Sequence, residues 1–238
     1  LVLAAETFRD AGAPYGEAFP MRVQQNGAFF SVAIFVEQPD ETYLERNGLD
    51  KNGALYKMFN SFTSSTSGVD KQTRLDEDNS DLQALISGLA LTNPNQITYL
   101  YDHVDLPAVI NHLAVQSLIH NNDHVGKNYY LYRDSEGTGL WQLVPWDLDL
   151  TLGRNFNSGG VLNDTMWAAI DPYGHPLFGD NEHRKYGNSI WNRFIDAVYN
   201  DATVREMYLR RLRTLMDELL QNSTTPYAER YYEQRIDE

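Results

Sequence analysis

The sequence contains no cysteine, which excludes disulfide bonds and thiolate metal sites. No apolar run approaches the roughly 20 residues that a membrane-spanning helix needs, and no signal peptide is visible. Basic residues are scarce, because 19 Lys and Arg stand against 33 Asp and Glu for a formal net charge of −14. Such a surface repels nucleic-acid phosphates, so we expect no DNA or RNA partner. It also repels nucleotides over long range, so a nucleotide site would need a local cation or metal.

The 238 residues are 42% hydrophobic and 12% aromatic, which is enough for one large domain or two small lobes around a cleft. The chain opens at Leu1 rather than at a Met, inside a segment with helical spacing of apolar residues. We therefore expect a single domain, residues 1–238, that lacks part of its N-terminal side.

The first 60 residues read mainly as strands. Asn26-Gly27 between two apolar runs predicts a hairpin of strands at Phe19–Gln25 and Ala28–Val36. A polar loop rich in Ser, Thr and Asp is expected over Asn60–Asp81, at the border between two parts, 1–60 and 80–238. Helices at Leu1–Arg9 and Glu41–Arg46 and a strand at Ala54–Phe59 complete the front of the chain.

The second part reads mainly as helices. Asp105 followed by Pro107 is a favourable helix start, and the apolar period continues to His120. Two strands, 128–132 and 140–144, follow around a turn. Further helices are expected from Asp81 to Leu91 and over 188–199, 202–221 and 225–236, with a loop over 158–187. Together, these strands and helices predict an α+β fold with a β-rich N-terminal part and a mainly helical C-terminal part.

Three oxygen-bearing residues fall in an order that suits phosphoryl transfer. Asp123 is followed five residues later by Asn128, and Asp147 arrives after the predicted hairpin. Phosphoryl transfer needs a carboxylate for the acceptor hydroxyl, an Asn and an Asp for Mg²⁺, and a Lys against the phosphates. Oxygen ligands suit a hard cation such as Mg²⁺ or Mn²⁺. Because Asp147 and Asp149 interrupt an apolar run, we expect them to be buried and to need a partner or a metal.

Two segments carry a family resemblance: Asn-Asp-His-x-x-Lys-Asn-Tyr-Tyr-Leu-Tyr at 122–132 and Pro-Trp-Asp-x-Asp-x-Thr-x-Gly at 145–153. Together they resemble the signature of the CotH kinase family. In the front half, Val23–Glu37 and Leu55-Tyr56-Lys57 are similar to that family's paired strands and its Lys-bearing strand. The resemblance covers most of the chain and implies a two-lobed atypical protein-kinase-like fold. The chain departs from other kinases in having no Gly-rich phosphate loop.

The resemblance also implies roles. Asp123 would be the catalytic base, and Asn128 and Asp147 would bind the metal. It implies ATP with Mg²⁺ or Mn²⁺ as cofactor, a Ser or Thr hydroxyl of a protein as acceptor, and an extracellular, cell-surface or spore-coat location. Lys57 paired with Glu37 would contact the ATP phosphates, with Lys127 and Asp149 as further phosphate and metal contacts.

Three other interpretations stay open at this point. His120 and His124 are four residues apart, which would suit a zinc site. A kinase-like fold could serve as a non-catalytic surface scaffold. Asp123 and Asp147 could form the acid and base of a glycosidase, although no aromatic cluster for sugar stacking accompanies them.

Overall fold

A four-stranded antiparallel sheet occupies the centre of the protein in the computed structural model, which describes residues 1–121, 123–152, 155–156, 162–163, 177 and 192–238. The strand order is β4-β3-β5-β6. β5 and β6 are buried almost throughout, because helices cover one face of the sheet and a smaller cluster covers the other. The strands are β3 (Ala54–Met58), β4 (Val69–Lys71), β5 (Tyr129–Arg133) and β6 (Trp141–Pro145).

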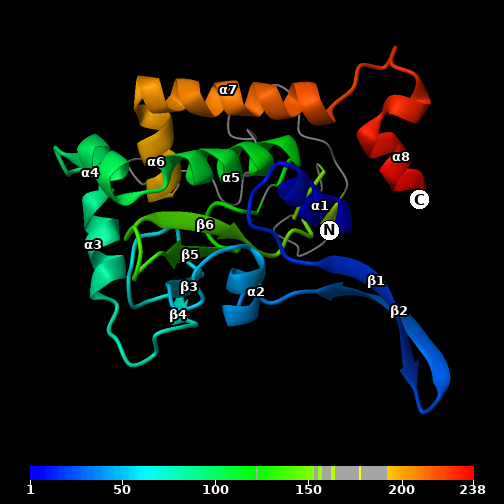
Figure 1. The fold of residues 1–238 in the computed structure, drawn as a ribbon, viewed down its shortest axis with the longest axis horizontal. Helices are drawn as coiled ribbons and strands as arrows, with labels where there is room; N and C mark the ends of the chain where they lie inside the picture. Colours follow the sequence, from blue (N-terminus) through cyan, green and yellow to red (C-terminus); the bar gives the residue numbers. More distant parts are fainter. Residues whose placement is uncertain (122, 153–154, 157–161, 164–176, 178–191) are drawn as a thin grey trace.

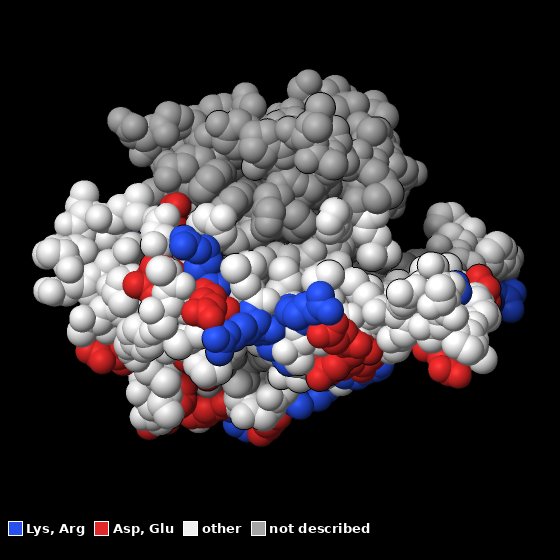
Figure 2. Space-filling model, turned by 90° about the horizontal axis from the view of Figure 1, so that it is seen from above, with Lys and Arg blue, Asp and Glu red and all other residues white. Residues whose placement is uncertain are grey.

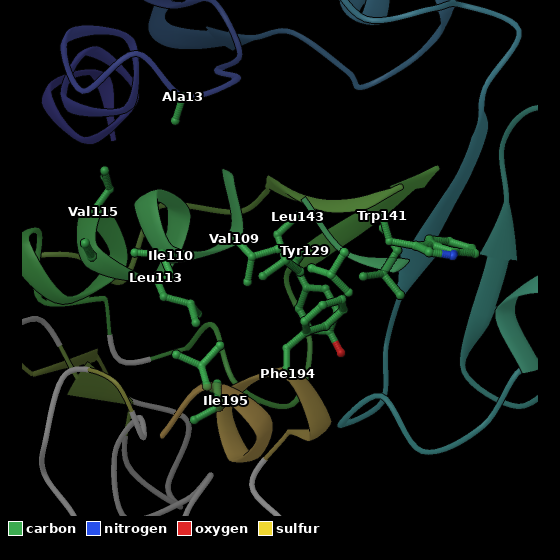
Figure 3. Packing of buried hydrophobic residues seen from close by; sticks show 14 of the residues in the cluster. Ala13, Val109, Ile110, Leu113, Val115, Tyr129, Trp141, Leu143, Phe194 and Ile195 are labelled. Atoms are coloured by element: carbon green, nitrogen blue, oxygen red, sulfur yellow. The ribbon is translucent and has the colours of Figure 1, made fainter. Parts of the chain in front are cut away.

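Helix α5 (Leu106–Leu118) lies between the sheet and helix α7 (Ala202–Leu219), as Figure 1 shows. Asp105 caps α5 by accepting a hydrogen bond from the Ala108 N–H at 3.1 Å, and Pro107 stands in the first turn. Apolar residues of α5 pack toward the sheet and toward helix α6 (Arg193–Asn200) in one buried cluster (Figure 3). The Asp105 N–H donates to the Trp141 carbonyl at 2.9 Å, so α5 begins beside the start of β6.

The opposite face of the sheet carries a smaller cluster. Helix α2 (Glu41–Arg46) begins at Asp40, whose carboxylate accepts from the Tyr43 N–H at 2.9 Å. Tyr43 and Leu44 then pack on the sheet residues Leu55, Tyr130, Tyr132 and Val144, with Trp146 at the edge.

Strands β1 (Ala18–Gln25) and β2 (Ala28–Val36) form a separate two-stranded sheet that projects from the body (Figure 1). Asn26 and Gly27 both have positive φ, 51° and 80°, as a tight hairpin turn of this kind requires. Large apolar side chains of both strands are exposed, among them Phe29, Phe30 and Val32.

The remaining elements frame this core. Helix α1 (Val2–Asp10) packs near α5, and Arg235 of α8 (Tyr231–Asp237) makes an ion pair with Glu6 of α1 at 2.9 Å. The other elements are α3 (Ser80–Gly88), α4 (Gln96–His103), a 3₁₀ turn (Tyr227–Glu229) and the short strands β7 (Asn155–Phe156) and β8 (Leu162–Asn163).

The face above α7 mixes both signs of charge (Figure 2). Two ion pairs lie along α7 and join Glu206 with Arg210 and Arg213 with Asp217. Within the described ranges, no helix is both long enough and apolar enough to cross a bilayer.

The α+β class and most predicted elements are confirmed, with three corrections. The predicted polar loop 60–81 contains β4, whose three residues pair with β3, so the short strand is set by a partner and not by its own composition. Helix α4 was not predicted. The last predicted helix, 225–236, is split into the 3₁₀ turn and α8. Most of the predicted loop 158–187 and the start of the predicted helix 188–199 lie outside the described residues.

Candidate active site

The last turn of α5 directs the chain into the candidate site. The His120 N–H donates to the Ser117 carbonyl at 3.2 Å, and the Asn121 N–H donates to the Gln116 carbonyl at 3.1 Å. With His120 in the left-handed region at φ 49°, these two bonds form a Schellman C-cap. The cap reverses the backbone direction, so that the following residues lie beside the helix end instead of extending it.

Asp123 is held by both cationic and amide donors. Its Oδ2 accepts from the Lys127 Nζ at 2.5 Å and from the Asn128 Nδ2 at 2.8 Å. Asp123 is only 5% exposed, whereas the Lys127 side chain reaches solvent. The predicted spacing of Asp123 and Asn128 is therefore realised as direct contact. Because the Asn128 amide nitrogen serves as donor, its amide oxygen is the end that could bind a cation.

The sheet register brings Asn128 and Asp147 to one end of the sheet. Tyr129 pairs with Pro145 across β5 and β6, so the two candidate ligands lie one and two residues beyond the paired ends. Both have positive φ, 68° for Asn128 and 54° for Asp147. Asn and Asp tolerate this conformation better than most residues, and such backbone outliers gather at functional sites.

The carboxylates of Asp149 and Asp123 act electrostatically on Asp147. Burial raises the pKa of Asp147 above its ordinary value, and the charges of Asp149 and Asp123 raise it further. The cations of Lys127 and Lys57 act in the opposite direction on the same pKa. Two carboxylates and two ammonium groups thus lie within electrostatic reach of Asp147, and a bound divalent cation would relieve the repulsion among the carboxylates.

The expected burial of both carboxylates needs correction. Asp149 and Asp147 are both exposed to solvent, Asp147 with part of its side chain buried, whereas the alternating residues Leu148 and Leu150 are 8% and 6% exposed. The apolar residues of this segment face the core, and the carboxylates open toward solvent, where a soluble ligand could reach them.

Lys57 lies on the face of β3 that looks toward Trp146. Its Nζ is 4.7 Å from the centroid of a Trp146 ring, and it also lies near the rings of Phe59 and Tyr130, at 5.4 and 5.8 Å. Aromatic faces hold the ammonium in place by cation–π attraction. Lys57 therefore stands close to the segment that carries Asp147.

The expected pairing of Lys57 with Glu37 is not formed. Glu37 accepts from Arg46 through both carboxylate oxygens, and its Oε2 also accepts from the Glu17 N–H at 2.9 Å. Both carboxylate oxygens of Glu37 are thus engaged by Arg46, which is the last residue of α2. A direct role for Glu37 toward a ligand stays a prediction.

Glu37 and Asp147 nevertheless line the same cavity, of about 280 Å³. The cavity walls are mostly apolar and aromatic, and its other lining residues include Phe8, Tyr43 and Trp146. Sequence reasoning missed this cavity, because its walls come from four separate segments and no local pattern marks it.

Asn192 is a further residue that sequence reasoning missed. Its Nδ2 donates to the Val125 carbonyl at 2.9 Å and to the Tyr129 hydroxyl at 3.0 Å, and its Oδ1 caps α6 by accepting from the Phe194 N–H. Asn192 thereby fixes the loop after Asp123 to the start of α6. Only the capping residue type before an amphipathic helix could have signalled it.

No group of three or more His, Cys, Asp or Glu that could hold a metal occurs in the part of the chain that the structure describes. The candidate set of Asn128, Asp147 and Asp149 instead combines one amide with two carboxylates, which fits the hard-cation chemistry expected for Mg²⁺. His120 serves as the C′ residue of the helix cap, so its place in the sequence has a conformational explanation that involves no zinc.

Comparison with known proteins assigns the chain to a family. A family model described as CotH kinase protein matches residues 2–236. The inner spore coat protein H of Bacillus subtilis (strain 168) is 26% identical over an alignment of 240 positions that covers 92% of this chain. This chain spans 66% of that relative, slightly less than two thirds of its length. Because the family model covers nearly the whole sequence, the chain belongs to the CotH kinase family.

Proposed function

We propose that the protein transfers the γ-phosphoryl group of ATP to a Ser or Thr hydroxyl of a protein acceptor. The observation that carries the proposal is the contact of Asp123 Oδ2 with Lys127 and Asn128, at the end of the sheet where Asp147 also lies. Family membership supports a kinase-like activity. The Ser or Thr acceptor is inferred from the sequence resemblance, because family membership by itself supports only a kinase-like activity.

Each residue has a role in this proposal. Asp123 accepts the proton of the acceptor hydroxyl as the hydroxyl oxygen bonds to the γ-phosphorus. The bond from the γ-phosphorus to the β–γ bridging oxygen breaks at the same step, and ADP leaves. Lys127 moves from Asp123 to a γ-phosphate oxygen, which frees the carboxylate for its work as base.

Asn128 and Asp147, with Asp149 beside them, would hold Mg²⁺ or Mn²⁺. When bound, that ion neutralises phosphate charge and orients the β- and γ-phosphates. Lys57, whose Nζ is 4.7 Å from the centroid of a Trp146 ring, would supply positive charge to the phosphates. The base of ATP would occupy the cavity next to Asp147, where aromatic and apolar walls suit a purine ring.

The named relative is a spore coat protein, and we propose a spore-coat or cell-surface location for this chain as well. Its acceptor would then be another protein of that layer. The acidic surface disfavours nucleic acid as a partner.

The test is phosphate transfer from γ-labelled ATP with Mg²⁺ or Mn²⁺, to the protein itself and to a casein-like acceptor. Asp147→Ala should abolish labelling and weaken metal–nucleotide binding, whereas Asp123→Ala should abolish labelling and largely retain nucleotide binding. Asp217→Ala, at an exposed position of α7, is the matched control and should keep full activity. Full activity in both site variants would refute the assignment, and nucleotide binding without transfer would favour the non-catalytic scaffold.

A further inference from the structure

A buried chain of polar side chains runs from the middle of α5 to the backbone of Asp123. The Asn121 Oδ1 accepts from the Asp123 N–H at 2.9 Å, and the Asn121 Nδ2 donates to the Gln116 Oε1 at 2.9 Å. Gln116 in turn lies 3.4 Å from His112, measured between the Nε2 atoms of the two side chains. Gln116 and Asn121 are both 0% exposed, and His112 is 2% exposed.

Polar groups buried this deeply reduce stability unless they are paired. Most other buried side chains of α5 are Leu, Ile, Val and Ala, with His112 and Ser117 as the other polar ones. The structural role of the Gln116 amide is its hydrogen bond with the side chain of Asn121.

The two ends of Asn121 perform different tasks. Its amide nitrogen anchors it to the rigid helix, and its amide oxygen holds the backbone of Asp123. The Schellman cap adds a second tie between the same two residues, because the Asn121 N–H donates to the Gln116 carbonyl. Backbone and side chain thus fix Asn121 against one residue of α5.

The hydrogen bonds have one direction, and they leave the His112 Nδ1 proton without a hydrogen-bond partner among the described residues. If Asn121 donates to the Gln116 oxygen, the Gln116 Nε2 must donate to His112, whose Nε2 then acts as acceptor. This requires a neutral imidazole, and burial lowers the pKa of His112 to about 3. The chain accordingly keeps one direction of hydrogen bonding from the loop to His112.

We propose that Gln116 and Asn121 are positioning residues that set the place of the Asp123 carboxylate for proton transfer. The inference rests on the proposed kinase function. A displacement of about 1 Å of a reacting group can lower a rate by as much as 10²-fold, so release of this anchor should reduce turnover more than it reduces nucleotide binding.

The experiment compares Gln116→Met, Asn121→Ala and Asn121→Asp with the parent protein. Gln116→Met keeps the side-chain length and the helix but removes the anchor, and Asn121→Ala removes both contacts. We expect kcat to fall about 10-fold or more in each, with KM for ATP within twofold of the parent. Asn121→Asp keeps the acceptor for the Asp123 N–H, and the Gln116 amide can rotate to donate to the new carboxylate, so it should recover much of the lost kcat.

Ser117→Ala is the matched control. Ser117 is the next residue of α5, is also buried, and shares a hydrogen bond of 2.7 Å with the Tyr208 hydroxyl on the other side of the helix. It should lower the melting temperature by a similar amount without a change in kcat. An equal loss of kcat in Ser117→Ala, or an unchanged kcat in Gln116→Met, would overturn the positioning role.

Amide hydrogen exchange at Asp123, followed by NMR, separates this inference from the proposed function. The Asp123 amide should be protected in the parent and in Ser117→Ala, and it should exchange at least 10-fold faster in Asn121→Ala and Gln116→Met. If the parent shows no phosphoryl transfer, this difference still decides whether the chain holds Asp123. Equal exchange rates in all variants would refute the anchor even if the protein is a kinase.

Discussion

The raised pKa of Asp147 has a consequence for stability as well as for catalysis. Burial and neighbouring carboxylates raise the folded-state pKa above the ordinary 3.8, so the folded protein binds more protons than the unfolded chain in the range between the two values. Stability is therefore lost as pH rises through this range. The loss of folding stability is complete above the folded-state pKa of Asp147 and absent below about 3.8.

Asp147→Asn should consequently stabilise the protein in the absence of metal while it removes metal-dependent nucleotide binding. We expect a rise in Tm on the order of 1 °C at pH 7, which diminishes as pH is lowered toward 4. Calorimetric melting over this pH range checks the prediction. With Mg²⁺ and ATP added, the order should reverse, because the ligand stabilises only the parent protein.

Asp134→Asn is the control for this prediction. Hydrogen bonds from Thr138 and Gly137 lower the pKa of Asp134, so its replacement should reduce stability at pH 7. A fall in the apo Tm of Asp147→Asn would contradict the view that this carboxylate is retained for ligand binding at the expense of stability.

At the residue scale, the sequence predicts contacts within one short loop and misses those between distant segments. Asp123 and Asn128 were predicted to serve one site, and they are in direct contact because the short loop between them leaves few alternatives. Asn192 was missed because its partner Val125 lies 67 residues away. Glu37 was given the wrong partner, since nothing in the strand shows that Arg46 would come beneath it.

At the element scale, strong local signals predicted the elements and weak ones did not. The Asn-Gly turn predicts the β1–β2 hairpin, and the capped amphipathic period predicts α5, almost to the residue. β4 has only three residues and is a strand because β3 supplies its hydrogen bonds. A single sequence contains no signal for such pairing when the strand is this short.

The hairpin also gives a test at this scale. Phe30 and Val32 are 64% and 66% exposed on β2, two residues apart, beside the position where the register with β1 shifts. Exposed contiguous apolar surface of this kind binds hydrophobic dyes and other chains. Phe30→Thr combined with Val32→Thr should lower the fluorescence of added 1-anilinonaphthalene-8-sulfonate by about half or more, with an unchanged Tm, because Thr retains strand propensity.

The matched control replaces Leu75 and Ile236 by Thr. Both are as exposed as the hairpin residues, 73% and 64%, but each stands in a separate part of the chain. Their replacement should leave dye fluorescence nearly unchanged. Equal decreases in dye fluorescence in the two double variants would show that the hairpin binds the dye no better than scattered apolar residues do.

At the scale of the whole molecule, charge opposes the function that the site suggests. The net charge of −14 repels ATP at distances beyond the site, whereas Lys57 and Lys127 attract it only at short range. Salt screens the long-range repulsion first, because the Debye length falls from about 30 Å at 0.01 M to about 10 Å at 0.1 M ionic strength. Contacts between lysine and phosphate inside the site are screened less.

The association rate of Mg²⁺-bound ATP should therefore rise with ionic strength between about 10 and 100 mM, by roughly two- to tenfold, opposite to the trend for proteins that attract their ligand. Stopped-flow measurements with a fluorescent ATP analogue give this rate directly. Adenosine carries no charge and should bind, if more weakly, with a rate that does not depend on salt. Lys57→Met should raise the dissociation rate and leave the salt trend intact, since one lysine changes the net charge little. An association rate that falls with salt would mean that the local field of the lysines reaches past the acidic surface, and the site would then be electrostatically steered in spite of the overall charge.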